Sequence, residues 1–144
     1  MKFTFKTAFF LTLIVLLLMS FKPVYAEEME VLIVVPSTGQ KFYSYAIMDE
    51  NWRVSAPLRD IISALGDVDI QWEPDEQRVT AQTKEHWCEC WIGENKATVD
   101  GDSVYLDTPP FVYYGRTYVP IRFIGESLGK QVEWNYGTRT ITLR

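Results

Sequence analysis

The chain has 144 residues and a formal net charge of −5, with 14 basic and 19 acidic residues. This acidic balance disfavours nucleic acid and anionic membrane surfaces as partners, because both are bound through clustered Lys and Arg. Only two cysteines are present, which excludes a fold held together by a framework of disulfides.

The first 26 residues have the layout of a secretory signal peptide. Lys2 and Lys6 give a positive start, an apolar run extends from Ala8 to Met19, and Val24–Ala26 places small residues at its end. The run is shorter than the ~20 residues that span a bilayer, so a retained anchor is the weaker interpretation. We expect an exported domain of residues 27–144, without stable membrane insertion after cleavage. Eleven basic and nineteen acidic residues would give it a net charge of −8.

One motif then occurs twice in the remaining chain. Both versions carry Pro, an aliphatic residue, Arg, a helix-like run, Leu-Gly and a later Trp. Alignment of Pro57 with Pro120 extends the correspondence over about 31–82 and 97–144. Two copies are too few for a solenoid, so we predict a single domain built from two degenerate strand–strand–helix–hairpin repeats. The motif reads "RVSAPLRDIISALGDVDIQWEP" at 53–74 and "TYVPIRFIGESLGKQVEWN" at 117–135.

Each copy predicts a short helix after its proline. Proline suits the first helical position, where its missing N–H costs nothing. The apolar residues that follow have helical spacing and would form one buried stripe. Gly66 and Gly129 are placed as left-handed helix stops. The stripes are Leu58, Ile61, Ile62 and Leu65 in the first copy, and Ile121, Ile124 and Leu128 in the second.

Alternating residues around turn signals predict hairpins on both sides of each helix. The turns fall near Asp49–Asn51 and at Gly115 before the helices, and within "EPDEQ" and "NYGT" after them. Ile70 shares a face with Trp72, so we expect Trp72 and its counterpart Trp134 to face the core. The predicted class is α+β, a mostly antiparallel twisted sheet packed around short helices.

The stretch "HWCEC" is the only one with soft metal ligands. On a strand, His86, Cys88 and Cys90 would share one face, and three such ligands could hold copper or zinc. The alternative is that they are small, partly buried side chains on a linking strand. We favour that alternative, so no metal site and no cofactor is predicted.

Arg59 and Arg122 occupy equivalent places in the first helical turn, where the helix dipole disfavours a cation by ~0.3–1 kcal/mol. We expect each to tie its helix to the sheet, with Glu73 or Glu133 as partner. Anion binding is the functional alternative.

The aromatic residues offer a candidate binding face. Trp87, Trp91, Tyr113 and Tyr114 are not assigned to the core by the pattern, and exposed aromatics in a row could grip a sugar chain or a protein. The alternative is that they fill the second face of the sheet.

The pattern Gly-Arg-Thr-Tyr-Val-Pro at 115–120, followed by Arg122-Phe123, Leu128-Gly129 and Glu133-Trp134, resembles the N-terminal domain of copper amine oxidases. The resemblance is close over 92–144. It is partial earlier in the chain, where it rests on Pro57, Arg59, Leu65, Gly66 and Trp72. It implies a five-stranded antiparallel sheet around a helix, in a stalk-type, non-catalytic module of exported proteins. It does not imply oxidase activity, because that centre needs copper on three histidines and a tyrosine-derived quinone, and this chain has one histidine.

No catalytic constellation is evident, because a single histidine leaves most Ser-His and Cys-His schemes without a base. We therefore predict an exported, non-enzymatic binding or scaffold domain at the cell surface or outside the cell. Its expected partners are another exported protein or cell-wall polysaccharide, with self-association as a further expectation. The alternative is a small extracytoplasmic metal-handling protein that uses His86, Cys88 and Cys90.

Overall fold

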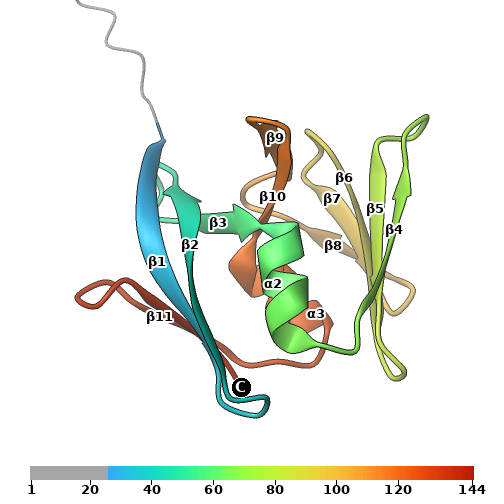
Figure 1. Ribbon diagram of the computed structural model, residues 1–144. Helices are drawn as coiled ribbons and strands as arrows, with labels where there is room; N and C mark the ends of the chain where they lie inside the picture. Colours follow the sequence, from blue (N-terminus) through green and yellow to red (C-terminus); the bar gives the residue numbers. More distant parts are fainter. Residues whose placement is uncertain (1–25) are drawn as a thin grey trace, which may run out of the picture.

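The computed structural model describes residues 26–144, and these form two β-sheets with two short helices between them (Figure 1). The predicted signal segment therefore lies outside the described residues, apart from Ala26. Most residues are in strands and nearly all strand pairs are antiparallel, which confirms the α+β class. The elements are β1 Glu27–Val35, β2 Gln40–Met48, β3 Val54–Pro57, α2 Leu58–Leu65, β4 Asp69–Glu73, β5 Arg78–Gln82, β6 Trp87–Trp91, β7 Lys96–Val99, β8 Asp102–Tyr105, β9 Phe111–Tyr113, β10 Arg116–Pro120, α3 Ile121–Ser127, β11 Val132–Asn135 and β12 Thr140–Leu143.

The strands divide unequally between the two sheets. The larger sheet has seven strands in the order β11-β12-β1-β2-β3-β10-β9, and the smaller has β4 to β8 in chain order. The pairing of β1 with β12 is the one parallel contact between the described strands. The single five-stranded sheet around one helix, implied by the resemblance, is therefore wrong for this chain.

Both helices begin directly after a proline, one residue later than predicted. Pro57 and Pro120 share the same backbone angles, φ −58° and ψ 122°. The φ is the one that the proline ring imposes, but the extended ψ leaves each proline as the last residue of a strand. Gly66 and Gly129 follow the helices with positive φ, 85° and 78°, but Gly66 has ψ −118° and is not in the left-handed helical conformation predicted for it.

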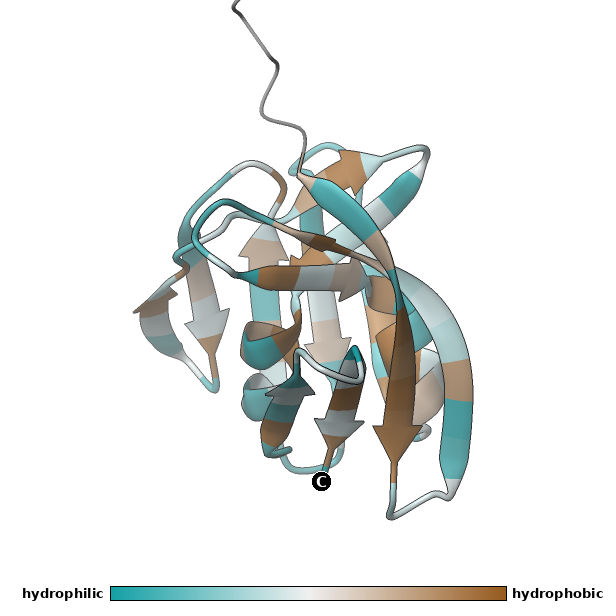
Figure 2. Cartoon of the chain, turned by 90° about the vertical axis from the view of Figure 1, so that its left-hand side faces the viewer, coloured by the Kyte–Doolittle hydropathy of each residue, from teal (hydrophilic) through white to brown (hydrophobic). Residues whose placement is uncertain are grey.

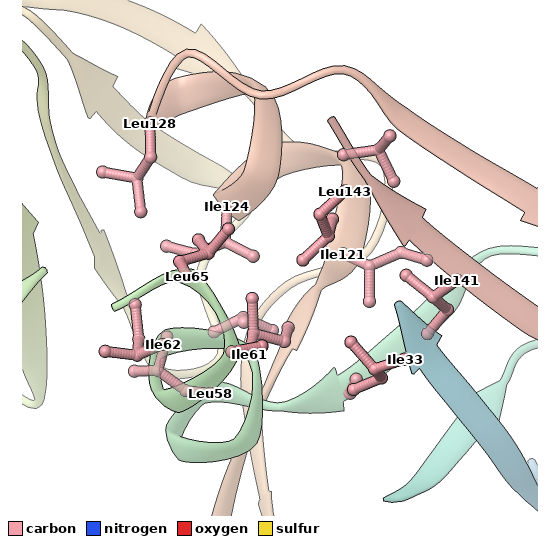
Figure 3. Packing of buried hydrophobic residues seen from close by; sticks show 14 of the residues in the cluster. Ile33, Leu58, Ile61, Ile62, Leu65, Ile121, Ile124, Leu128, Ile141 and Leu143 are labelled. Atoms are coloured by element: carbon pink, nitrogen blue, oxygen red, sulfur yellow. The ribbon is translucent and has the colours of Figure 1, made fainter. Parts of the chain in front are cut away.

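The helix stripes fill the space between the sheets. All seven predicted stripe residues are buried. Figure 3 shows them meeting one another and the side chains of Ile33, Ile141 and Leu143 from the larger sheet. A helix of eight residues is marginal alone in water, so this burial, ~1.5–3 kcal/mol for each large aliphatic side chain, is what holds α2 and α3. The second half of β1 contributes a hydrophobic run to the same core (Figure 2).

The strand registers relate the two halves of the chain. Ala56 and Val119, which the sequence alignment treats as equivalent, lie directly opposite each other in the β3–β10 ladder. The hairpin after each helix has the same register, with Trp72 opposite Val79 and Trp134 opposite Ile141. The halves also differ, because β12 joins β1 in parallel whereas β5 joins β6 antiparallel.

The two tryptophans of these hairpins have different environments. Trp134 is partly buried and packs against the core, but Trp72 is 45% exposed. The prediction that Trp72 faces the core is therefore wrong. The reason is that β4 is an edge strand of the smaller sheet, and four of its five residues are exposed.

Candidate ligand groove

An open groove of about 480 Å³ lies where the two sheets approach each other around α3. One wall comes from the β2–β3 turn and from β11 with its following turn. The other comes from β7, β8 and the loop after β8, and α3 forms the floor. The volume falls in the ~300–1,000 Å³ range typical of small-molecule sites. Aromatic side chains line much of the groove, namely Trp52, Tyr105, Phe123, Trp134 and Tyr136.

Three of these side chains form an aromatic corner, which we define as Trp52, Trp134 and Tyr136. The ring centroids of Trp52 and Tyr136 are 6.2 Å apart with planes at 76°, and those of Trp134 and Tyr136 are 5.4 Å apart with planes at 74°. Such edge-to-face contacts stabilise aromatic pairs beyond their buried area. Trp52 and Tyr136 nevertheless remain 66% and 54% exposed. Their faces are therefore open to a ligand.

Trp52 is held in position by the turn that carries it. Its φ is 62°, a left-handed conformation that is costly for a bulky side chain. The carboxylate of Asp49 accepts hydrogen bonds from the backbone N–H groups of Asn51 (2.8 Å) and Arg53 (2.9 Å) on either side of it. The Tyr136 hydroxyl also donates to the carbonyl oxygen of Trp52 at 3.4 Å. An exposed tryptophan is thus fixed by its neighbours on both sides.

Asp49 also joins the two walls of the groove. The Thr108 hydroxyl, from the loop after β8, donates to its second carboxylate oxygen at 2.6 Å. Partial burial acts to raise the pKa of Asp49, but the hydrogen bonds from Thr108 and from the two backbone N–H groups outweigh it and lower the pKa below its ordinary value. Asp49 is therefore charged near neutral pH and holds the turn and the loop together.

The charged side chains of the groove occur as two opposite pairs. Arg53 and Asp107 face each other at the rim with Nη2 and Oδ2 2.5 Å apart, and the Arg122 Nε lies 3.9 Å from a Glu126 oxygen. These are the charged residues among the groove lining, so the groove is electrically neutral. This contrasts with the acidic balance of residues 27–144.

The ligand set that "HWCEC" offered as the alternative function does not come together. Cys88 and Cys90 are buried on the inner face of β6, whereas His86 precedes the strand and its Nδ1 contacts the Asp100 carboxylate at 2.9 Å. Burial raises the pKa of both thiols to about 12, which disfavours the thiolate that a metal requires. Among residues 26–144, no three His, Cys, Asp or Glu side chains are grouped to hold a metal ion.

His86 lines a second hollow of about 320 Å³, which is more polar. It lies between the C-terminal ends of α2 and α3 and the turn after β5. Lys84, Lys130 and Asp67 are among its other lining residues.

The predicted role of the two helix arginines is also wrong. Arg59 and Arg122 are exposed, and the ion pair of Glu133 is with Arg144. The tie between helix and sheet is made by Asp60, the next residue along α2. Its carboxylate accepts a hydrogen bond from Ser44 of β2 at 2.5 Å and two from Arg116 of β10 at 2.8 and 3.0 Å. An acidic residue in the first turn is favoured by the helix dipole, which explains why it takes this place.

The binding face expected from the sequence lies elsewhere than the groove. Trp87, Trp91 and Tyr113 are half-buried, and Tyr114 is exposed at the β9–β10 turn. Trp52, Tyr105 and Tyr136 were not selected from the sequence. The position of Trp52 and Tyr136 in turns is the sequence feature that could have identified them, because a turn does not itself require a large aromatic side chain.

The sequence model described as "Copper amine oxidase N-terminal domain" matches residues 37–143, which include both helices and every strand except β1. The chain belongs to this family. The resemblance expected from the sequence is thereby confirmed. The copper amine oxidase N-terminal domain is a non-catalytic, stalk-type domain that usually occurs in exported proteins.

The motif of the copper amine oxidase N-terminal domain has a structural role in this chain. Gly115 turns the β9–β10 hairpin with φ 72°, Arg116 binds Asp60, and Tyr118 is buried against Phe111 with ring centroids 5.4 Å apart. No helix among the described residues is long and apolar enough to cross a membrane. No curated protein and no solved structure was found to match the chain.

Proposed function

We propose that the chain is an exported, non-catalytic binding domain that meets a cell-wall glycan or another exported protein through the groove. The observation that carries the proposal is the aromatic corner, where two exposed rings are fixed beside a half-buried one in an open groove. Aromatic side chains are enriched at binding interfaces, and exposed apolar side chains that are grouped together mark interaction sites. Family membership agrees with a binding or spacer role, since the domain is non-catalytic in its family.

We further propose that residues 27–144 form one domain made of two degenerate copies, about 31–82 and 97–144, and that the chain is cut after Ala26. The mutual pairing of Ala56 with Val119 and the common register of the two hairpins support the duplication. A duplicated unit repeats its packing residues, whereas the two most exposed rings of the aromatic corner differ between the copies. Trp52 aligns with Gly115 and Tyr136 with Pro74, although Arg53 aligns with Arg116. The groove is therefore a feature of the assembled domain and not of either copy.

The metal-handling alternative has no observation in its favour. It requires His86 beside Cys88 and Cys90 with accessible thiolates. The side chains are separated and the thiols are buried with raised pKa values.

The test is a binding assay with the exported protein recovered from cells that express the full chain. It is incubated with purified cell walls and, separately, with the other exported proteins of the producing cell. We expect retention on one of the two, and a loss of roughly tenfold or more in affinity in Trp52→Ala/Tyr136→Ala, the size expected when central aromatic anchors are removed.

The matched control is Tyr43→Ala, because Tyr43 is 70% exposed on β2 and does not line the groove. It should bind as the wild type does, and circular dichroism should show that all variants are folded. If the Trp52→Ala/Tyr136→Ala variant is retained as well as the wild type, the binding surface lies outside the groove. Absence of retention on either material would refute the proposed function.

A further inference from the structure

We propose that the groove binds a single, uncharged glycan chain, with sugar rings seated in the aromatic corner. This rests on the proposed function and specifies its ligand class. Three properties of the groove carry the inference: the electrical neutrality of its lining, the angles between its aromatic rings and the polar groups at its rim.

The neutrality of the groove excludes ligands that depend on charge. Its two arginines are each opposed by a carboxylate, and the domain around it has eight more acidic than basic residues. A polyanion would meet repulsion from that surplus without a free cluster of cations to offset it. A polycation would be attracted to the domain as a whole, but the groove itself provides no net negative charge to bind it. An uncharged ligand incurs neither cost.

The aromatic rings suit the apolar face of a sugar. A pyranose ring presents axial C–H groups on its faces and hydroxyl groups around its edge. The open faces of Trp52 and Tyr136 can contact those C–H groups while the hydroxyl groups stay in reach of water and of polar side chains. Tyr105, 79% exposed, lies on the opposite wall and offers a further ring along the groove.

The angles between the rings indicate one separate chain and not a flat surface. The planes of Trp52 and Trp134 are turned by 76° and 74° from that of Tyr136. A flat array of packed chains could contact only one of these rings at a time. A single chain can enter the groove, stack on one ring and place its edge against the next.

The groove supplies both hydrogen-bond donors and hydrogen-bond acceptors. Arg53 and Asp107 stand on one side, with side chains about half exposed, and Arg122 and Glu126 stand on α3. Guanidinium groups donate and carboxylates accept in fixed directions, which matches neighbouring hydroxyl groups of a sugar. A peptide anchored by apolar side chains would instead bury these four charges, at a cost in desolvation. A proline-rich peptide remains the protein ligand that could stack on these rings.

The experiment measures binding of soluble β-1,4-linked hexamers of glucose and of N-acetylglucosamine to the exported protein by titration calorimetry and tryptophan fluorescence. We expect saturable binding to at least one hexamer. Its affinity should change less than about twofold between 0.05 and 0.5 M NaCl, because no ligand charge is screened. Trp52→Ala should weaken it roughly tenfold or more, and Tyr43→Ala should leave it unchanged. A crystalline sheet of the same polysaccharide should retain little protein, because its packed chains cannot enter the groove.

The other outcomes separate the glycan inference from the proposed function. If neither hexamer binds but an exported protein or a proline-rich peptide is held in a Trp52-dependent way, the glycan inference is wrong and the proposed function stands. If affinity falls steeply with salt, or an anionic polysaccharide binds more tightly than the hexamers, the ligand is charged and the inference is wrong. If neither hexamer binds and the cell-wall and exported-protein assays are also negative, both proposals fail.

Discussion

Gly125 lies within α3 at the point where the helix crosses β11. A Cβ atom at this position would stand 2.3 Å from Cγ2 of Val132 and 3.4 Å from Cδ2 of Leu143. Its backbone has no positive φ, so the requirement is for close packing and not for an unusual conformation. The aligned residue of the first copy is Ile62, a buried stripe residue, and the alignment does not identify Val132 or Leu143 as the partners of this contact.

Replacement of Gly125 by alanine should destabilise the domain. Alanine would gain ~1 kcal/mol in helix propensity over glycine, but a clash with a packed valine forces shifts that typically cost ~1–3 kcal/mol. The clash is with the side chain of a buried residue and cannot be relieved by rotation into solvent. We expect the free energy of unfolding, measured by urea denaturation, to fall by about 1 kcal/mol, the difference between the clash and the gain in helix propensity.

Gly137→Ala is the matched control, because its added Cβ would meet only the Asn135 Oδ1, at 3.4 Å. It should unfold within about 0.5 kcal/mol of the wild type. Equal stability of the Gly125 and Gly137 variants would mean that α3 packs less closely on β11 than the structure shows.

At the scale of elements, Asp60 connects three of them: α2, which carries it, β2 through Ser44, and β10 through Arg116. Asp60→Asn keeps the shape of the side chain and removes its charge. A hydrogen bond to a charged group contributes ~1.5–3 kcal/mol, and the half-exposed Arg116 places this one at the lower end. We expect a loss of about 1.5 kcal/mol in the free energy of unfolding.

Arg59→Ala provides the comparison, since Arg59 is the adjacent residue of the same helix and is exposed. It should change stability by less than about 0.5 kcal/mol. A larger loss in the arginine variant than in the Asp60 variant would restore the original expectation that the arginine ties helix to sheet.

Local patterns predicted the elements better than their arrangement. The helices follow from the spacing of Leu58, Ile61 and Leu65, and the hairpins from turn residues such as Gly115, because both depend on neighbours in the chain. The exposed side of Trp72 could not be predicted, since it depends on β4 being an edge strand. The aromatic corner could not be predicted either, because Trp52 and Tyr136 are brought together from distant turns by the sheet.

At the scale of the whole molecule, the buried thiols link stability to alkaline pH. Burial raises the pKa of Cys88 and Cys90 to about 12 in the folded state, against an ordinary value of 9.0. The unfolded chain therefore releases these protons first as the pH rises. The two protonated thiols therefore contribute fully to the free energy of unfolding below about pH 9, and this contribution is lost progressively from pH 9 toward pH 12.

The prediction is tested by urea unfolding of the wild type and of Cys88→Ala/Cys90→Ala at pH 7, 9 and 10.5. The difference in the free energy of unfolding between the two proteins should begin to shift against the wild type near pH 9, where the thiols of the unfolded chain are half ionised, and should shift much further at pH 10.5. Comparison with the variant cancels the titration of tyrosines and lysines. A difference that does not vary with pH would show that the thiols titrate alike in both states.

The order of strands in the larger sheet has a consequence for how the protein is made. β1 begins at Glu27, yet its neighbour on one side is β12, which ends at Leu143. The hairpin of β11 and β12 reaches the rest of that sheet only through this contact. Until residues 140–143 have been synthesised, β1 lacks its partner along one edge, and the part of the hydrophobic core that Ile141 and Leu143 fill stays open. A nascent chain of this topology can therefore complete its larger sheet only after β12 has left the ribosome.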